Sequence, residues 1–478
     1  MKLSDVLKGL DYTLTGNDAD ITSIEYDSRR VKAGSLFVAI KGFQTDGHLY
    51  IDKAIENGAS AILFEEGEAK QGGSFAKCAD TRIGLSIAAA NFYENSASRL
   101  KIIGVTGTNG KTTTTTLIKN ILELKGYKTG LIGTNQNMIG DEVIKTERTT
   151  PESCDLHALF NEMEAKGVTH VVMEVSSHAL VLNRTHGINF EVGVFTNLTQ
   201  DHLDFHKTME EYCKAKAILF SQSKKGVINI DDKWGKSIIK NSGCPAITYG
   251  IDAEADLKAE NVKMSEKGVI FDAVYNGEVQ NIKLGIPGKF SVYNALSAIG
   301  ACLQLGIGFE EIAKGLVLAK GVKGRAEIVP LPAGYTVLID YAHTPDGLEN
   351  IINTVQDFAS GDVITVFGCG GDRDKTKRPK MGAIAGKLSD YVIVTSDNPR
   401  TEDPDAIIKD ILEGMTEFTN YEVEPDRTKA IGRALKIAKD NDVIILAGKG
   451  HETYQILKDK TIDFDERKIL RELFESMN

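Results

Sequence analysis

Short apolar runs that end in polar, glycine-rich stretches recur along the chain. Residues 102–105 are apolar and lead into Gly107-Thr-Asn-Gly-Lys-Thr112, and a helix-compatible stretch follows to about residue 124. Because strands alternating with helices are typical of a parallel sheet covered by helices, the pattern predicts an α/β fold. Parallel strands present their carboxyl ends at one sheet edge, so loops that follow several such strands predict a binding site there. Four such runs lie in the last third of the chain, at 335–340, 363–367, 391–395 and 443–446.

The first of these loops has the order of a nucleotide-binding site, which is strand, glycine loop and helix N-terminus. Glycines let backbone N–H groups close around phosphate oxygens, and the helix dipole favours the anion. Lys111 can reach the terminal phosphates, and Thr112 can offer its hydroxyl to Mg²⁺. The usual pattern G-x-x-x-x-G-K-[ST] is incomplete, because Val105 stands at its first glycine. An ordinary strand–helix turn is therefore the alternative to the nucleotide loop that we predict.

Polar side chains also follow two apolar runs in the middle of the chain. Glu174 ends the run 171–174, and His202 follows the run 192–195. At the carboxyl ends of neighbouring strands, these residues could give a metal near the phosphate loop an oxygen and an imidazole ligand. The alternative is a capping acid and an ordinary loop histidine. Lys216 lies in a predicted amphipathic helix, where a solvated lysine is the ordinary interpretation.

Composition narrows the class of protein. A length of 478 residues suggests about three domains. The net charge is −11 and there is no basic block, which disfavours nucleic-acid binding. The six cysteines are scattered without a C-x-x-C pair, which argues against a zinc site and a disulfide framework. We expect a cytoplasmic protein without a membrane span, because no apolar run approaches about 18 residues and the N-terminus lacks a signal-peptide core.

Seven motifs, in order, resemble those of the Mur ligase family, and in particular its type that adds 2,6-diaminopimelate. They are GVTGTNGKT, MEVSSHAL, FTNLTQDHLDFH, YAHTPD, GCGGDRDKTKRP, SDNPR and GKGHE. The resemblance implies an α/β protein of three domains. These would be a UDP-sugar-binding domain at 1–98, a central ATP-binding domain at 99–323 and a C-terminal Rossmann-like, amino-acid-binding domain at 324–478.

The resemblance also implies residue roles. The family's ATP-binding residues correspond to Gly107, Thr108, Asn109, Gly110, Lys111, Thr112, Thr113, Asn294, Arg325 and Asp340. Its metal ligands correspond to Thr112, Glu174, His202 and Lys216 (as a carbamate), and its catalytic residues to Lys111, Glu174, His202 and Lys216. Its UDP-substrate contacts correspond to Ser28, Thr149, Thr150, Ser176 and Arg184. Its amino-acid contacts correspond to Arg373, Asp397, Asn398, Pro399, Arg400, Gly448 and Glu452. Ser291 and Leu182 depart from residues that relatives often carry, so no contact is expected of either.

The implied activity is an ATP- and Mg²⁺-dependent amide ligase of cytoplasmic peptidoglycan precursor synthesis. It would join meso-2,6-diaminopimelate to the D-Glu γ-carboxylate of UDP-N-acetylmuramoyl-L-alanyl-D-glutamate through an acyl phosphate, as a monomer with no nucleic-acid or membrane partner. Arg400 would hold the distal carboxylate that L-lysine lacks, while a surface arginine near Glu402 and Asp403 is the alternative. The alternative functions are the same ligase with L-lysine as the amino acid, a folylpolyglutamate synthase-like ligase, and a nucleotide-switched binding module. The Asp27-Ser-Arg29 and Asp397-Asn-Pro-Arg400 segments speak against the folylpolyglutamate synthase, although Asp27–Arg29 alone could be a turn.

Overall fold

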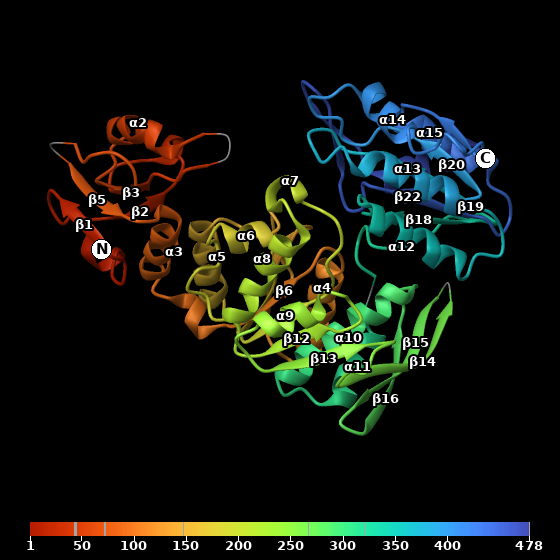
Figure 1. The fold of residues 1–478 in the computed structure, drawn as a ribbon, viewed down its shortest axis with the longest axis horizontal. Coiled ribbons are helices and arrows are strands. Elements are labelled where there is room, and N and C mark those ends of the chain that lie inside the picture. The colour runs from red at the N-terminus through yellow and green to blue at the C-terminus, as the bar shows by residue number, and fades with distance from the viewer. Residues whose placement is uncertain (43–44, 71–72, 147, 266, 320, 478) are drawn as a thin grey trace.

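Three large sheets surrounded by helices make up the protein. The computed structural model describes residues 1–42, 45–70, 73–146, 148–265, 267–319 and 321–477. The sheets have five, eleven and six strands, and a separate pair, β23 and β24, completes the strands described. Figure 1 shows the first sheet near the N-terminus, the last near the C-terminus, and the largest between them. The α/β fold predicted from the sequence is confirmed.

The N-terminal sheet has the strand order β1-β5-β4-β3-β2. Its central strands β3 and β4 are buried along their whole length, as expected of strands covered on both faces. Its elements are α1 (Leu3–Val6), β1 (Tyr12–Thr15), β2 (Ser23–Glu25), β3 (Ser35–Val38), α2 (Ile51–Glu56), β4 (Ala61–Phe64), β5 (Ser74–Cys78) and α3 (Thr81–Phe92).

The central sheet has the order β16-β15-β14-β13-β12-β11-β6-β10-β7-β8-β9. The neighbouring strands β14-β13-β12-β11-β6-β10-β7 pair in parallel. Its elements up to the strand before the edge hairpins are β6 (Lys101–Thr106), α4 (Lys111–Leu124), β7 (Thr129–Ile132), β8 (Asn137–Ile139), β9 (Glu142–Ile144), α5 (Ser153–Ala165), β10 (His170–Glu174), α6 (Ser177–Val181), β11 (Val192–Phe195), α7 (Leu203–His206), α8 (Met209–Ser221), β12 (Gly226–Asn229), α9 (Gly235–Asn241) and β13 (Ala246–Gly250). The glycine loop therefore leaves β6 in the interior of the sheet, between β10 and β11.

Antiparallel strands extend this sheet at one edge, and two helices follow them. Asn276 and Gly277, predicted as a turn, both have positive φ and join β15 to β16, as a tight hairpin requires. The sequence pattern predicts a helix over 294–305, whereas helix α10 begins five residues earlier, at Lys289, because the turn at Pro287-Gly288 ends there. The elements are β14 (Leu257–Ser265), β15 (Gly268–Tyr275), β16 (Glu278–Leu284), α10 (Lys289–Gln304) and α11 (Phe309–Val317).

The C-terminal sheet has the order β17-β18-β22-β19-β20-β21, parallel from β18 to β21. The loops after β18, β22, β19 and β20 therefore meet at one edge, as predicted. Its elements are β17 (Glu327–Val329), β18 (Thr336–Asp340), α12 (Pro345–Gln356), β19 (Val363–Phe367), α13 (Lys377–Leu388), β20 (Tyr391–Val394), α14 (Pro404–Leu412), β21 (Tyr421–Val423), α15 (Arg427–Ile437), β22 (Val443–Ala447), β23 (Tyr454–Ile456), β24 (Thr461–Asp463) and α16 (Glu466–Met477).

The apolar core is divided unevenly among the sheets. Two apolar clusters lie around the N-terminal sheet and its helices, and Cys154 is their only residue from later in the chain. One large cluster contains buried residues of both the central and the C-terminal sheets. The predicted domain bounds 98/99 and 323/324 fall between the sheets and stay predictions. All six cysteines are free. In the part of the chain that the structure describes, no helix is both long and apolar enough to cross a membrane.

Candidate active site

The glycine loop turns tightly into the first residue of α4. Gly110 has φ +85°, a conformation that favours glycine, and a Cβ there would lie 2.4 Å from Asn294 Oδ1. The Lys111 ammonium donates to the carbonyl oxygens of Gly107 and Thr108 at 2.8 Å each. Backbone N–H groups at a helix N-terminus, together with an ammonium, provide the charge and donors that a phosphate needs.

The Glu174 carboxylate lies at the end of β10, beside Thr112 of the glycine loop. Thr112 Oγ1 donates to its Oε1 at 2.9 Å, and the backbone amide and hydroxyl of Thr134 donate to Oε1 and Oε2 at 3.0 and 2.9 Å. A carboxylate and a threonine hydroxyl are hard oxygen ligands of the kind that Mg²⁺ prefers, so these residues fit that ion. No group of three His, Cys, Asp or Glu side chains that could hold a metal occurs among the described residues.

His202 lies on the same cavity as Glu174, at the start of α7. Its backbone has φ +53°, and its imidazole Nε2 lies 3.3 Å from Asp201 Oδ2. The ring of His178 meets it edge to face, with 4.9 Å between the ring centroids. His202 is thus held by an acid on one side and an aromatic ring on the other.

Lys216 is buried inside α8 rather than solvated. Its side chain is 1% exposed, and Nζ lies 4.4 Å from the centroid of the Tyr212 ring. Burial, with a further contribution from the Lys111 ammonium, lowers the pKa of Lys216 well below its ordinary value. The ordinary interpretation of Lys216 as a solvated helix lysine is therefore wrong. Lys216 is not among the described residues that line the cavity around Glu174.

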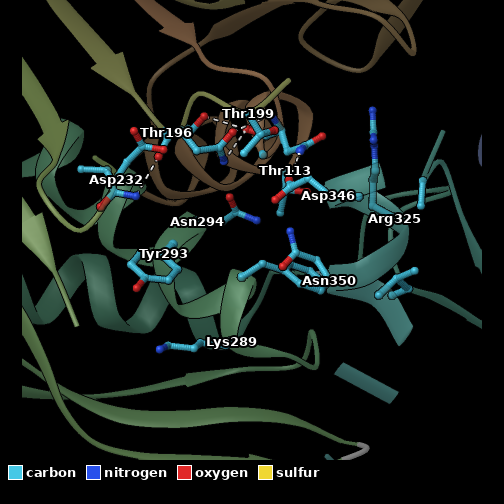
Figure 2. A pocket seen from close by; sticks show the side chains of 18 of the residues that line it. Thr113, Thr196, Thr199, Asp232, Lys289, Tyr293, Asn294, Arg325, Asp346 and Asn350 are labelled. Atoms are coloured by element: carbon cyan, nitrogen blue, oxygen red, sulfur yellow. Dashed lines mark hydrogen bonds between the residues drawn. The ribbon is translucent and has the colours of Figure 1, made fainter. Parts of the chain in front are cut away.

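A cavity of about 320 Å³ extends from the glycine loop towards α10 and α12. Figure 2 shows Asn294 in its middle, with Tyr293 and Lys289 on one side and Asn350 and Arg325 on the other. Six of the residues predicted to bind ATP line it, namely Asn109, Gly110, Thr113, Asn294, Arg325 and Asp340. Ser291 does not line it, and its hydroxyl instead donates to the Pro287 carbonyl at 2.7 Å.

A second cavity, of about 510 Å³, joins the glycine loop to the C-terminal sheet. Thr108, Asn109, Gly110, Lys111 and Thr112 line it on one side, with Thr149, Glu174 and His202. Six residues predicted to bind the amino acid line it on the other side, namely Arg373, Asp397, Asn398, Arg400, Gly448 and Glu452. Residues that belong to the central and the C-terminal sheets thus line one cavity. Predicting each loop separately from the sequence could not establish that the loops share it.

The far wall of this second cavity contains two arginines and two acids, namely Arg373, Arg400, Asp397 and Glu452. Arg400 Nη1 donates to the carbonyl oxygens of Gly371 and Asn398, at 2.9 and 3.3 Å, and its backbone has φ +53°. Burial and the nearby Arg400 guanidinium lower the pKa of Arg373. Within the described chain, the ion pairs of Glu402 go to Lys375 and Arg378 and none goes to Arg400. Arg400 is half-buried, which does not favour the alternative of a surface arginine near Glu402 and Asp403, and its role as an amino-acid contact stays a prediction.

Four of the five predicted UDP-substrate residues form a connected group in the central domain. Thr150 Oγ1 donates to the Glu174 carbonyl at 2.9 Å and accepts from the Ser176 amide at 3.1 Å, while Arg184 Nη1 donates to the Thr150 carbonyl at 3.1 Å. The Thr149 hydroxyl lies 3.0 Å from that of Thr134. Ser28 lies apart, in a short 3-10 turn of the N-terminal domain, and no contact among the described residues joins it to this group.

Several residues at these cavities were not predicted from the sequence. Thr134 lies two residues beyond the end of β7, and Glu174 is the last residue of β10, so the rule of strand ends could have found Thr134 as well. Asp346 accepts a hydrogen bond from Asn109 Nδ2 at 2.6 Å, although the two residues are 237 positions apart. Tyr293 and Asn350 carry no motif signal, because their position on the cavity depends on how α10 and α12 approach each other.

The chain matches known families along most of its length. Residues 20–105 match the family described as Mur ligase family, catalytic domain, residues 105–302 the Mur ligase middle domain, and residues 324–450 the Mur ligase, glutamate ligase domain. A UDP-N-acetylmuramoyl-L-alanyl-D-glutamate--2,6-diaminopimelate ligase of Clostridium botulinum is 52% identical, and the match covers 100% of both chains. A ligase of the same name from Caldanaerobacter subterraneus is 51% identical over 99% of both chains.

Solved structures agree with these matches. A structure of a UDP-N-acetylmuramoyl-L-alanyl-D-glutamate--2,6-diaminopimelate ligase superposes with a TM-score of 0.71 and 30% identity, covering 100% of this chain and 99% of the other. A folylpolyglutamate synthase of Mycobacterium tuberculosis superposes with a TM-score of 0.65 over 77% of this chain and 92% of its own, and at 18% identity it shares the fold alone. The full-length identity to the first group settles the family: this chain is a member of the Mur ligase family.

Proposed function

We propose that this chain is the ATP-dependent ligase that adds meso-2,6-diaminopimelate to the D-Glu γ-carboxylate of UDP-N-acetylmuramoyl-L-alanyl-D-glutamate, in peptidoglycan precursor synthesis. One observation carries the proposal beyond the names of the relatives. The glycine loop, Glu174 and the residues around Arg400 face a single cavity. A ligase needs its phosphate donor and its amine close together, and this cavity brings the corresponding residues to one place.

The first step moves the γ-phosphate of ATP to a carboxylate oxygen of the muramoyl dipeptide, which leaves ADP and an acyl phosphate. Lys111 and the backbone amides of the loop hold the phosphates in line with that oxygen, because phosphoryl transfer depends mainly on position and charge. Bound Mg²⁺ would supply positive charge that polarises the γ-phosphate. Thr112 and Glu174 would hold it, with His202 on the same cavity.

The second step forms the amide. The neutral amine of diaminopimelate attacks the acyl carbon, the C–O bond to phosphate breaks, and the amine proton leaves with solvent or phosphate. Water in the cavity would hydrolyse the acyl phosphate, so closing the site around both reactants protects the intermediate. Contacts between residues that line the cavity and come from different parts of the chain, such as the hydrogen bond from Arg325 Nη2 to Thr112 Oγ1 at 3.2 Å, are suited to this closure.

Lys216 is proposed to carry a carbamate. A neutral amine adds CO₂ and loses one proton, so the neutral side chain becomes an anion that can coordinate Mg²⁺. Its burial and lowered pKa favour the neutral amine that this reaction requires. Without the modification, a neutral amine would bring no negative charge to the metal.

The amino-acid end of the site supports diaminopimelate over L-lysine. Arg400 and Arg373 offer guanidinium groups to the second carboxylate, and Asp397 and Glu452 offer acceptors to an ammonium. The UDP portion is proposed to contact Ser28, with Thr149, Thr150, Ser176 and Arg184 nearer the reacting carboxylate. The monomeric state and the cytoplasmic location stay predictions.

The test is ADP release by the purified protein with ATP, Mg²⁺ and substrates added singly and together. We expect release only when both UDP-N-acetylmuramoyl-L-alanyl-D-glutamate and meso-diaminopimelate are present, with L-lysine a much poorer amine. Equal turnover of L-lysine would support the lysine-adding alternative. Release that depends on a folate substrate, or on a macromolecule without any amine, would reject the proposal in favour of a folylpolyglutamate synthase or a nucleotide-switched module.

A further inference from the structure

Lys449 is an ammonium buried directly behind the wall of the second cavity. It is 0% exposed, and it does not line the cavity although its neighbour Gly448 does. It stands between two glycines with positive φ, Gly448 at +115° and Gly450 at +53°. An isolated buried ammonium is costly, so the groups around Lys449 must compensate its charge.

Three side chains of the cavity wall surround the Lys449 ammonium. It donates to Asn398 Oδ1 at 2.8 Å and to Glu452 Oε2 at 3.1 Å, and it lies 3.8 Å from Asp397 Oδ1. Each of these three partners is less than 10% exposed and lines the cavity. One buried cation thus faces two acids, which leaves a net charge of about −1 on the group.

These contacts fix the orientation of Asn398. Its Oδ1 accepts from both Lys449 and the Ile456 amide, the latter at 2.9 Å, so its Nδ2 must point the other way and donates to Glu452 Oε2 at 2.8 Å. Glu452 therefore uses Oε2 inside the wall, and its Oε1 remains for a ligand. Lys449 contacts both the amide and the carboxylate, and it is the charged donor among these contacts.

A buried ion pair in the core of the C-terminal domain holds the backbone near Lys449. The side chains of Arg427 and Glu466 are both 0% exposed and paired at 2.8 Å, and Arg427 Nη2 also donates to the Ala447 carbonyl at 2.9 Å, two residues before Lys449. Gly448 passes so close to the wall that a Cβ there would lie 2.4 Å from Asp397 Oδ2. Lys449 is therefore held on a rigid backbone, as a group that positions others must be.

We infer that Lys449 is a positioning residue of the amino-acid site, which together with Asn398 holds Glu452 so that its Oε1 receives the ammonium of the incoming amino acid. The inference rests on the proposed function, because it concerns the site for the amine. Lys449 itself makes no contact with substrate in this inference. Substituting Lys449 should therefore weaken the binding of diaminopimelate, and not that of ATP or the UDP substrate.

The test is Lys449→Met, which keeps the length of the side chain and removes the charge. We expect the KM for meso-diaminopimelate to rise about 10- to 100-fold, as when a partner that orients a ligand is lost, with the KM values for ATP and the UDP substrate changed less than about twofold. The matched control is Lys119→Met, which loses a buried lysine paired with Glu123 at 2.7 Å in α4. It should lower the melting temperature and leave the KM for diaminopimelate unchanged.

A pH profile provides a second readout. Burial raises the pKa of Glu452 and the Lys449 ammonium opposes that rise, while Asp397 raises it further and Tyr341 and Tyr454 also face the carboxylate. Removing the ammonium should therefore move the acidic limb of kcat/KM for diaminopimelate to higher pH. If Lys449→Met does not fold, Lys449→Gln serves for the same measurements, since it also removes the charge.

The outcomes separate the two proposals. A wild-type protein that releases no ADP with diaminopimelate would reject the proposed function itself. An active wild type, with a Lys449 variant that loses only stability or only kcat and keeps its KM and pH profile, would overturn the positioning role alone.

Discussion

At the scale of single residues, Lys216 shows how a position on a helix face decides what a side chain does. Lys216 lies four residues after Tyr212 and four before Phe220, and residues at this spacing share a helix face. Both neighbours are buried, whereas Lys214 on the other face is exposed. The periodicity of the sequence thus contained a signal for burial, which the residue type alone concealed.

This contrast yields the first prediction. Lys216→Ala should lower kcat by about 10²- to 10³-fold, as when one group that stabilises a developing charge is lost. Added short carboxylates should restore part of the activity by supplying the missing anion, and ¹³C NMR of wild-type enzyme in labelled bicarbonate should show a carbamate signal. Lys214→Ala is the control and should keep full activity. A fully active Lys216→Ala would remove the modification from the mechanism.

Arg400 supports a prediction about which amino acid is used. A guanidinium can bind a carboxylate through two parallel hydrogen bonds, and losing one partner of a buried charged pair costs about 2–5 kcal/mol. Arg400→Ala should therefore lower kcat/KM for meso-diaminopimelate by roughly two to three orders of magnitude, at about 1.4 kcal/mol per tenfold, and that for L-lysine far less. The control is Arg433→Ala, which changes an arginine 49% exposed in the same domain. An unchanged ratio of the two kcat/KM values would contradict the role of Arg400.

At the scale of elements, Glu402 ties the loop of Arg400 to α13. It accepts from Arg378 through both carboxylate oxygens, at 2.9 and 3.0 Å, and Arg378 also reaches Asp410 on α14 at 2.8 Å. The hydrogen bonds from Arg378 outweigh burial and hold the pKa of Glu402 at about 2. Because this pKa is lower in the folded protein than in the unfolded chain, the stability that Glu402 contributes is present above about pH 4.5 and lost as the pH falls toward 2.

Glu402→Gln should therefore reduce the free energy of unfolding by about 1–3 kcal/mol at pH 7. The difference from wild type should shrink as the pH is lowered from 4.5. Urea unfolding across that range measures it, and Glu417→Gln, an exposed acid with no ion pair within the described chain, is the control. A constant difference at every pH would show that Glu402 acts through packing rather than charge.

Elements also show where sequence reasoning succeeds. The runs at 335–340, 363–367 and 391–395 contain the strands β18, β19 and β20, and the run at 443–446 covers all of β22 but its last residue, because buried parallel strands are continuous apolar runs. The helix α9 and the true start of α10 were not predicted, since both depend on local turns and on packing against the sheet. The ion pairs of Arg378 with Glu402 and of Lys449 with Asp397 join separate segments of the chain, and no spacing rule predicts such pairs.

At the scale of the whole molecule, the central and C-terminal sheets meet through polar contacts beside the ATP cavity. Asn109 of the glycine loop donates to Asp346 of α12, and Arg325 Nη2 donates to Thr112 Oγ1 at 3.2 Å. Asp346→Ala should raise the KM for ATP about 5- to 10-fold, because one hydrogen bond that positions the loop is lost. Calorimetry should find the affinity for the UDP substrate unchanged. Asp357→Ala, at the other end of the same helix, should alter neither, and an unaltered KM in Asp346→Ala would place the domain contact outside the ATP site.

While the ribosome makes the chain, the core shared by the central and C-terminal sheets is incomplete until the last third has emerged. The N-terminal sheet has its own clusters, so it can fold first and needs only Cys154 from later in the chain. The roughly 150 residues after 323 take about 8–30 s to synthesise at the usual 5–20 residues per second, and during that time the central sheet exposes apolar surface. A message cut short there should yield an aggregating product that needs a chaperone, whereas completing the last third removes that need.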